Sequence, residues 1–279
     1  MKTKTVLVTG ANGYIGRHVV KALLKRKYDV KAVDLITDGI APEAEILKVS
    51  IFDGDVDIYK KLGEPDIVIH LAWRNGFVHN ADSHILDIPD HYTFIKNLFA
   101  GGLKQIAIMG TMHEVGYWEG AIDEHTPTNP SSLYGMSKNI LRQIALQTAK
   151  EYGGICQWLR AYYILGDDLK NHSVFTKISQ MAEAGEATFP FTSGKNKYDF
   201  LEVDELAEQI AAAATQDRIT GIINCCSGKP VALADKVQEF IVRHGYQIRP
   251  DFGAYPDREY DSPGVWGDAA RIQQIMSAE

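Results

Sequence analysis

The stretch from Thr5 to Leu24 constrains the fold more than any other part of the chain. Thr5 to Thr9 is a short run dominated by β-branched residues, and Gly10, Gly13 and Gly16 follow it. Apolar residues at helical spacing come next, at Val19, Val20, Leu23 and Leu24. This pattern predicts a strand, a glycine-rich turn and a helix. We therefore expect an α/β protein built on a Rossmann-like, doubly wound parallel sheet.

Each glycine of the turn has a mechanical use. Gly10 permits a tight turn, Gly13 lets backbone amides approach a pyrophosphate, and Gly16 allows the helix to pack closely on the strand. The turn therefore predicts a dinucleotide cradle at a helix N-terminus. The same ligand is expected to contact three turn residues between the glycines: Asn12, Tyr14 and Ile15.

A carboxylate stands where a dinucleotide ribose would need it. The second predicted strand, Asp29 to Val33, ends at Asp34, 18 residues beyond Gly16. Asp34 is placed to accept hydrogen bonds from the adenosine ribose hydroxyls, and it would repel the extra phosphate of NADP. NAD is therefore the expected cofactor and NADP the less favoured one. The alternative interpretation is that Asp34 only caps a loop.

The following segments extend the sheet. Leu35 to Ala44 is too short for a crossover helix, so a loop or one helical turn is expected before a strand at Glu45 to Val49. The next strand, Ile67 to Leu71, leads into Ala72 and Trp73 at the carboxyl edge, where open α/β sheets bind ligands. The chain then predicts a helix near Tyr92 to Ala100 and a strand from Gln105 to Met109 that Gly110 and Thr111 close.

Tyr134 and Lys138 open an apolar-periodic run that predicts a long helix. Residues four apart lie on one face of a helix, so an ammonium can sit beside a phenol. A nearby cation favours the phenolate and lowers the phenol pKa, which would suit proton exchange with a carbinol or ketone. Taken alone, the pair is more often part of a solvated helix face.

Composition limits the class of protein. The 279 residues are 45% apolar with a net charge of −7, and no basic stripe or long apolar run occurs. We expect no nucleic acid partner, no membrane span, no secretory signal and no metal site, and a cytoplasmic location. The three cysteines lack metal-binding spacing and are expected to be buried, reduced thiols: Cys156, Cys225 and Cys226.

Several motifs occur in an order that resembles the extended short-chain dehydrogenase/reductase family, the nucleotide-sugar epimerases, dehydratases and ketoreductases. The resemblance covers nearly the whole chain, which would make it a short, atypical member. Its first half contributes the glycine turn, His70-Leu71-Ala72, Thr111, the Asp123-Glu124 pair before Pro127 and Pro130, and Tyr134 with Lys138. Its second half contributes Tyr198 to Asp204 and Asn224 to Gly228.

The resemblance implies a role for each matching residue. Thr111 would hydrogen-bond the reacting oxygen, Tyr134 would be the general acid/base, and Lys138 would lower its pKa and bind the nicotinamide ribose. The cofactor would supply the hydride chemistry. Further cofactor contacts are expected from five residues at strand ends: Ser50, Ile51, Leu71, Ala72 and Trp73.

Departures from the family pattern narrow the chemistry. Met112 and His113 stand where dehydratases carry an Asp-Glu pair, so dehydration is disfavoured. His113 is expected to be structural or to contact substrate, although it could act as a base. Tyr163 replaces an asparagine that helps to hold the substrate in the family, and Ser50 replaces an adenine-binding aspartate.

The expected domain organisation is unequal. Residues 1–165 would form the NAD-binding domain with the catalytic residues, and residues 166–279 mainly a small, discontinuous α/β substrate lobe, with segments around 199–225 returning to the first domain. Helices are expected at Val174 to Ala184, Asp204 to Ala214 and Ala234 to His244, with Asp204 as an N-cap. Among the basic residues of this lobe, Arg258 is the first candidate for a substrate diphosphate; the alternative is a solvated arginine.

The sequence thus favours an NAD(P)-dependent oxidoreductase that acts at a sugar carbinol or ketone, at C4 of a nucleotide-activated hexose. A nucleotide-sugar 4-epimerase is the alternative, and net change in NADH separates the two. A third possibility is a dinucleotide-binding sensor or scaffold without turnover, but such a protein would not need Thr111, Tyr134 and Lys138 together. The resemblance also implies a homodimer paired through the Tyr134 helix and the helix before it.

Overall fold

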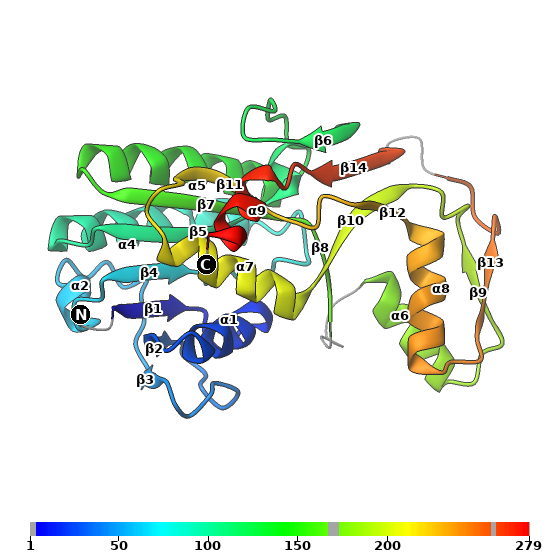
Figure 1. The fold of residues 1–279 in the computed structure, drawn as a ribbon, viewed down its shortest axis with the longest axis horizontal. Helices are drawn as coiled ribbons and strands as arrows, with labels where there is room; N and C mark the ends of the chain where they lie inside the picture. The colour runs from blue at the N-terminus through cyan, green and yellow to red at the C-terminus, as the bar shows by residue number, and fades with distance from the viewer. Residues whose placement is uncertain (1–3, 167–172, 258–260, 279) are drawn as a thin grey trace.

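In the computed structural model, which describes residues 4–166, 173–257 and 261–278, a large parallel sheet is flanked by helices and a small lobe lies to one side (Figure 1). The sheet has seven strands in the order β11-β7-β5-β4-β1-β2-β3, and every neighbouring pair is parallel. The strands are β1 (Thr5–Thr9), β2 (Asp29–Val33), β3 (Glu45–Leu47), β4 (Ile67–His70), β5 (Gln105–Thr111), β7 (Ile155–Ala161) and β11 (Gly221–Cys225).

This order confirms the predicted doubly wound sheet. The chain winds outward from β1 through β2 to β3, then returns to β4 on the other side of β1. Ligands bind at such a reversal point, at the carboxyl ends of the strands. Eleven residues, 34–44, join β2 to β3 as a loop, as the shortness of this segment predicts.

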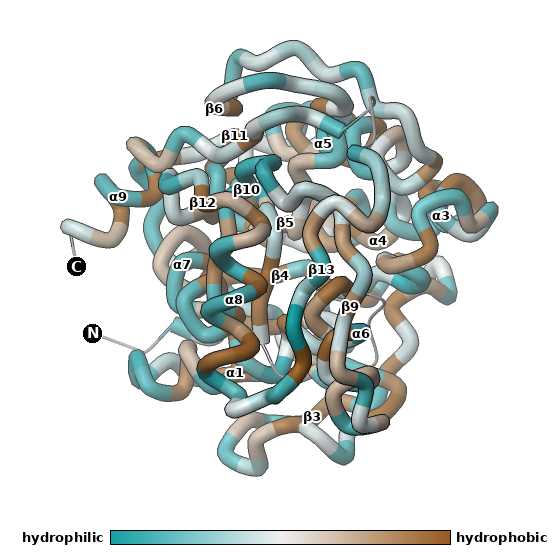
Figure 2. The backbone as a smooth tube through the Cα atoms, turned by 90° about the vertical axis from the view of Figure 1, so that its right-hand side faces the viewer, coloured by the Kyte–Doolittle hydropathy of each residue, from teal (hydrophilic) through white to brown (hydrophobic). Residues whose placement is uncertain are grey.

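Helices bury apolar stripes on both faces of the sheet. Alternate residues of β1 serve the two faces, since Val6 and Val8 belong to one core and Leu7 to the other. The first core packs against α1 (Tyr14–Lys25) and α7 (Val203–Thr215), and the second against α2 (Ile58–Lys61), α4 (Ile88–Gly101) and α5 (Leu133–Glu151). Figure 2 shows the resulting hydrophobic stretch along β4 in the interior.

A second, five-stranded sheet links the two lobes. Its path is β12-β10-β14-β6, and β8 pairs with β10. These strands are β6 (Gly120–Ile122), β8 (Tyr163–Leu165), β10 (Lys197–Glu202), β12 (Pro230–Ala232) and β14 (Gly264–Gly267). The buried Asp199 carboxylate on β10 ties the sheet together, because it accepts hydrogen bonds from the backbone of Ser227, Gly228 and Gly267 at 2.8, 2.9 and 3.2 Å.

The small lobe has its own apolar core of Ile178, Phe189, Phe191, Val237, Ile241 and Ile248. It consists of α6 (Val174–Glu183), α8 (Leu233–His244) and a two-stranded parallel sheet of β9 (Thr188–Phe191) and β13 (Arg249–Phe252). The last helix, α9 (Ala270–Ser277), packs back on α7 in the large lobe. Segments beyond residue 165 therefore contribute to both lobes (Figure 1).

One capping prediction is wrong. α7 begins at Val203 with Glu202 at its N-cap, so Asp204 lies inside the first turn. Its Oδ1 lies 2.6 Å from Nδ1 of His18 on α1, which ties the two helices together.

The three cysteines are free and buried, as expected. No helix in the described ranges combines the length and apolarity needed to cross a bilayer.

Candidate active site

Thr111 and Tyr134 come together from two elements at the carboxyl edge of the large sheet. Thr111 is the last residue of β5, and Tyr134 lies in the first turn of α5, which Ser132 caps by accepting from the Gly135 N–H at 3.2 Å. The Thr111 hydroxyl lies beside the Tyr134 phenol and lowers the pKa of that group. The structure thus gives the phenol a hydroxyl partner at a place where a reacting oxygen could sit.

The pKa of Tyr134 moves opposite to the direction expected from the sequence. Burial raises it to about 12; the Thr111 hydroxyl lowers it, and the negative charge of Glu114 raises it further. Lys138 is not the controlling neighbour. Its Nζ donates to the Met109 carbonyl at 2.8 Å and lies 3.8 Å from the centroid of the Trp73 ring. Desolvation of the phenolate therefore outweighs the cation one helical turn away.

Lys138 is itself strongly affected by burial. Its side chain is 4% exposed, and burial lowers its pKa to about 7, against a smaller opposite effect of Glu114. The indole face of Trp73 and the Met109 carbonyl are the groups that hold the ammonium form. Near neutral pH, Lys138 can therefore either carry or release a proton.

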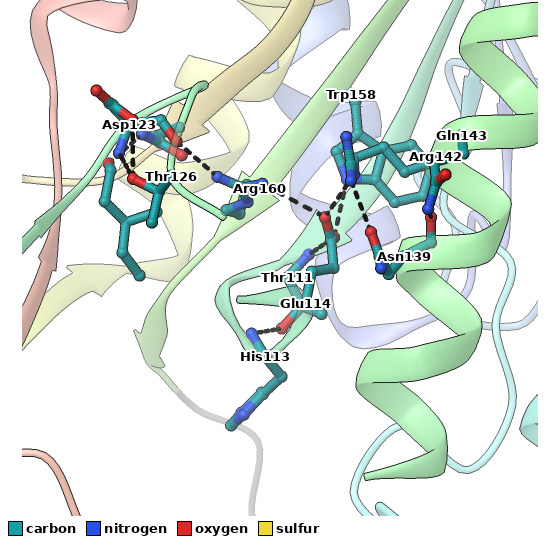
Figure 3. Close-up of polar contacts among 12 residues, drawn as sticks. Thr111, His113, Glu114, Asp123, Thr126, Asn139, Arg142, Gln143, Trp158 and Arg160 are labelled. Atoms are coloured by element: carbon teal, nitrogen blue, oxygen red, sulfur yellow. Dashed lines mark hydrogen bonds and ion pairs between the residues drawn. The ribbon is translucent and has the colours of Figure 1, made fainter. Parts of the chain in front are cut away.

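Glu114 lies at the centre of this site, and the sequence patterns did not single it out. It is fully buried, and its Oε1 accepts hydrogen bonds from the Thr111 N–H and the Trp158 Nε1–H, both at 2.8 Å. Its Oε2 lies 3.4 Å from Nε of Arg142 and 3.6 Å from Nη2 of Arg160 (Figure 3). Burial raises the pKa of this carboxyl, and the two arginines oppose that effect.

Glu114 and Thr111 form a capping box around the short 3₁₀ helix η1 (Met112–Glu114). The spacing Thr-x-x-Glu is a recognisable sequence signal for this motif, so it could have revealed Glu114. The carboxylate faces Trp158 and the two arginines and accepts from the Thr111 N–H, so it positions Thr111 through the main chain.

His113 points away from the Glu114 cluster (Figure 3). Its ring centroid lies 6.1 Å from that of Tyr134 and 4.6 Å from that of His79. Burial lowers the pKa of His113 to about 4. The imidazole is therefore neutral at neutral pH and can both donate and accept one hydrogen bond.

The glycine turn leaves no room for side chains. Gly10 has a φ of +65°, and a Cβ there would lie 2.7 Å from the Ala72 nitrogen; a Cβ on Gly16 would lie 2.1 Å from the Gly10 carbonyl oxygen. The α1 helix that starts after Gly13 has neither a side-chain cap nor an acidic residue in its first turn. Its free N–H groups and positive dipole end suit a pyrophosphate.

A cavity of about 550 Å³ extends from this turn to the neighbouring strand ends. Asp34 lies in its wall and accepts a hydrogen bond from the Asn12 N–H at 3.0 Å. The expected cofactor residues that line it are Gly10, Gly13, Asp34, Ser50, Ile51, Leu71, Ala72 and Trp73. The close-packed turn and the carboxylate at the end of β2 both fit NAD.

The remaining predicted residues have separate positions. The Asn12 side chain holds residues 38–39 by hydrogen bonds of 3.1 and 2.9 Å, Ile15 packs on the core, and the Tyr14 hydroxyl abuts Gly166. The Tyr163 ring packs against Tyr198 and Phe200 at centroid distances of 4.5 and 5.8 Å, so the structure does not bring it to Tyr134. Arg258 lies outside the described residues.

Trp73 connects the cavity to the catalytic candidates. It lines the cavity, and its ring centroid lies 6.2 Å from that of Tyr134. Its Nε1–H donates to Nδ1 of His84 at 3.1 Å, and its ring stacks on His91 at 4.6 Å.

Within the described ranges, the histidines and acids of this region form no cluster suited to a metal ion. A separate cavity of about 230 Å³, between β8 and the helices α6 and α8, does not include Thr111, Tyr134 or Lys138.

A Rossmann sheet with a glycine turn, and a Thr-Tyr-Lys set at the adjoining strand end, define the class of the extended short-chain dehydrogenases/reductases. A sequence model of the NAD dependent epimerase/dehydratase family matches residues 6–226. The chain belongs to this family and is an NAD-dependent enzyme, as the sequence predicts.

Individual relatives agree with this assignment. The chain is 41% identical over 269 residues to a dTDP-6-deoxy-L-talose 4-dehydrogenase (NAD(+)) of Aggregatibacter actinomycetemcomitans, covering 94% of this chain and 98% of that protein. It is 28% identical to a putative UDP-glucose 4-epimerase of Methanocaldococcus jannaschii, covering 98% of this chain and 91% of that protein. The fold is similar to that of a UDP-N-acetylglucosamine 4-epimerase from Methanobrevibacter ruminantium, with a TM-score of 0.85 and 22% identity. The match covers 99% of this chain and 92% of that structure.

Proposed function

We propose that the chain is an NAD-dependent dehydrogenase that oxidises the C4 carbinol of a dTDP-activated 6-deoxyhexose, and that dTDP-6-deoxy-L-talose is its substrate. The observation that carries the proposal is that Tyr134 has the Thr111 hydroxyl beside it and contacts Trp73, which lines the cofactor cavity. The 41% identical relative of nearly equal length supports the choice of sugar.

The reaction divides between the cofactor and the chain. Bound NAD would supply the hydride acceptor for the carbinol carbon. The Thr111 hydroxyl orients the reacting oxygen, and Tyr134 accepts its proton; in reduction, Tyr134 donates the proton instead. Lys138 binds the nicotinamide ribose, and Asp34 the adenosine ribose. Because the phenol pKa is about 12, oxidation should accelerate as the pH rises.

A 4-epimerase is the second candidate, because the chain is 28% identical over almost its whole length to a putative UDP-glucose 4-epimerase. An epimerase returns the hydride to the opposite face of the keto sugar, so it produces an isomer with no net NADH. A dehydrogenase releases the 4-keto sugar and one NADH per sugar. Both candidates use the same Thr111, Tyr134 and Lys138 set.

The test is incubation of the protein with NAD and a panel of dTDP- and UDP-sugars, followed by NADH measurement and mass spectrometry of the sugar. Oxidation of dTDP-6-deoxy-L-talose with equimolar NADH supports the dehydrogenase. Conversion of a sugar to its C4 isomer without NADH supports the epimerase and contradicts our first choice. Replacing NAD with NADP should lower turnover, because Asp34 would face the added phosphate.

Two further proposals concern the molecule in the cell. The exposed apolar side chains of Met136 and Ile140 on α5 and of Tyr92 on α4 support a homodimer paired through these helices. The three buried free thiols support a reducing, cytoplasmic location.

A further inference from the structure

Three imidazoles surround the Tyr134 ring. His79 stacks on it with a centroid distance of 5.4 Å and an interplanar angle of 14°. His84 lies at 5.2 Å and His113 at 6.1 Å, and His79 also contacts His113 at 4.6 Å. His79 and His84 follow β4 in the chain, whereas His113 belongs to η1, so the group assembles only in the fold.

The backbone fixes His79 in this position. The Tyr134 N–H donates to the His79 carbonyl at 2.8 Å, and the Leu133 N–H donates to Oδ1 of Asn80 at 3.2 Å. These are N–H groups of the first turn of α5, which have no partner inside the helix. The segment that carries His79 is therefore tied to the start of the helix that carries Tyr134, and the imidazole need not form a bond of its own to stay there.

The other histidines of the region already have partners. Nδ1 of His84 accepts from Trp73 at 3.1 Å, and its Nε2 lies 2.9 Å from the Val78 carbonyl. His70 lies between Thr9 and His91, at 2.7 and 2.9 Å. These contacts use the ring nitrogens of His84 and His70 within the protein and explain both residues as structural.

His79 and His113 differ from them. In the part of the chain that the structure describes, no ring nitrogen of either residue hydrogen-bonds to the protein. Burial lowers the pKa of both imidazoles, so each is neutral at neutral pH and presents one donor and one acceptor. A hydroxyl group, which can both donate and accept, matches such a pair.

We propose that His79, together with His113, binds the sugar hydroxyl next to the reacting carbinol and so selects the sugar. This inference rests on the proposed function. In a C4 dehydrogenase of a 6-deoxyhexose, that hydroxyl is the one on C3, because the other neighbour, C5, carries no hydroxyl. His79 is a specificity-determining residue, and it leaves the proton transfer to Tyr134.

The test compares two substrates and three proteins. His79→Phe keeps a ring on Tyr134 but removes both hydrogen-bonding atoms, and His79→Asn keeps a donor and an acceptor. With dTDP-6-deoxy-L-talose, His79→Phe should lower kcat/KM about threefold to tenfold, mainly through KM, as expected for one lost hydrogen bond. His79→Asn should restore part of that loss. With the 3-deoxy analogue, His79→Phe and the wild type should have equal kcat/KM.

His125→Phe is the matched control, because the His125 side chain is 85% exposed on the loop after β6. It should leave both substrates unaffected. Equal kinetics of His79→Phe and the wild type on dTDP-6-deoxy-L-talose would overturn the inference about His79 and leave the proposed function intact. An equal loss on both substrates would also overturn it, because His79 would then act by packing on Tyr134. If the wild type converts no nucleotide sugar, the proposed function fails and the inference fails with it.

Discussion

Tyr134 and Lys138 have pKa values displaced in opposite directions by one cause. Burial disfavours whichever form is charged, so it raises the pKa of the phenol and lowers that of the amine. The sequence pattern indicated the pair correctly as neighbours on a helix, but spacing alone carries no information about desolvation. The two groups also share a charged neighbour: the buried carboxylate of Glu114 raises the pKa of both.

Glu114→Gln tests this coupling. Without the negative charge, the pKa of Tyr134 should fall, so the rise of oxidation rate with pH should shift to lower pH. Stability should fall by about 3–5 kcal/mol, because the buried Arg160 loses its charged partner. Kinetic pH profiles and urea denaturation measure the two effects. Glu151→Gln, at the exposed end of α5, is the control. An unshifted profile would contradict the role of Glu114.

The lowered pKa of Lys138 predicts how the stability of the folded chain changes with pH. Its pKa is about 7 in the folded chain and about 10.4 when unfolded. Between these values the unfolded chain holds a proton that the folded chain lacks, so stability from this group rises with pH. Relative to Lys138→Met, the wild type should therefore gain stability from about pH 7 to about pH 10. Denaturation midpoints across that range measure it, and a parallel pH dependence of the two proteins would disprove the shift.

At the scale of elements, the glycine turn is the most tightly determined part of the fold. The Cα of Gly16 and the carbonyl of Gly10 approach so closely that even a methyl group collides. The turn therefore fixes the distance between β1 and α1 and holds the N-terminus of α1 over the cavity. This explains why the sequence pattern located the turn correctly.

Gly16→Ala should lower stability by about 1–3 kcal/mol, because helix and turn must separate to admit the Cβ. It should also weaken NAD binding about tenfold or more. Gly76→Ala is a matched control, since a Cβ there meets nothing within 4 Å, and its stability should change by no more than about 0.5 kcal/mol. Calorimetry provides both values. Normal NAD affinity in Gly16→Ala would show that the turn does not hold the cofactor.

Local patterns predicted the long amphipathic helices better than the short strands: α6, α7 and α8 each have ends within one residue of the expected bounds. β1 and β2 have the expected bounds, because each is a short apolar run with clear ends. α4 begins four residues before its expected start, at Ile88, because Pro89 occupies its first turn. Short strands such as β8 and β12 have little pattern of their own and exist through pairing with β10. Partners distant in sequence, including Glu114 with Trp158, left no local signal beyond the Thr-x-x-Glu spacing.

At the scale of the whole molecule, the two lobes share the second sheet. β10 pairs with β8 and β12 and joins β14, so it connects the small lobe to the edge of the large sheet. Asn224 on β11 donates to the Ile122 carbonyl at 2.7 Å, which holds β6 to the same frame. The small lobe is therefore placed relative to the cofactor cavity by hydrogen-bonded strands.

The proposed dimer makes a prediction about surface residues. Met136 and Ile140 are 39% and 41% exposed and lie four residues apart on α5, and the neighbouring helix α4 carries the 39% exposed Tyr92. A charge at this surface, in Ile140→Glu, should convert a dimer to a monomer. Val242→Glu on α8 is the control, because Val242 is 80% exposed in the other lobe. Light scattering gives the mass; a monomeric wild type would contradict the proposal.

The most direct test of the account is the turnover of Tyr134→Phe on the substrate that the wild type oxidises, with the NAD dissociation constant measured in the same protein. The variant keeps the ring and its contacts with His79 and Trp73 but cannot exchange a proton. We predict a loss of about 10²- to 10⁴-fold in kcat with NAD affinity nearly unchanged. Turnover equal to that of the wild type would contradict the assignment of Tyr134 as the acid/base.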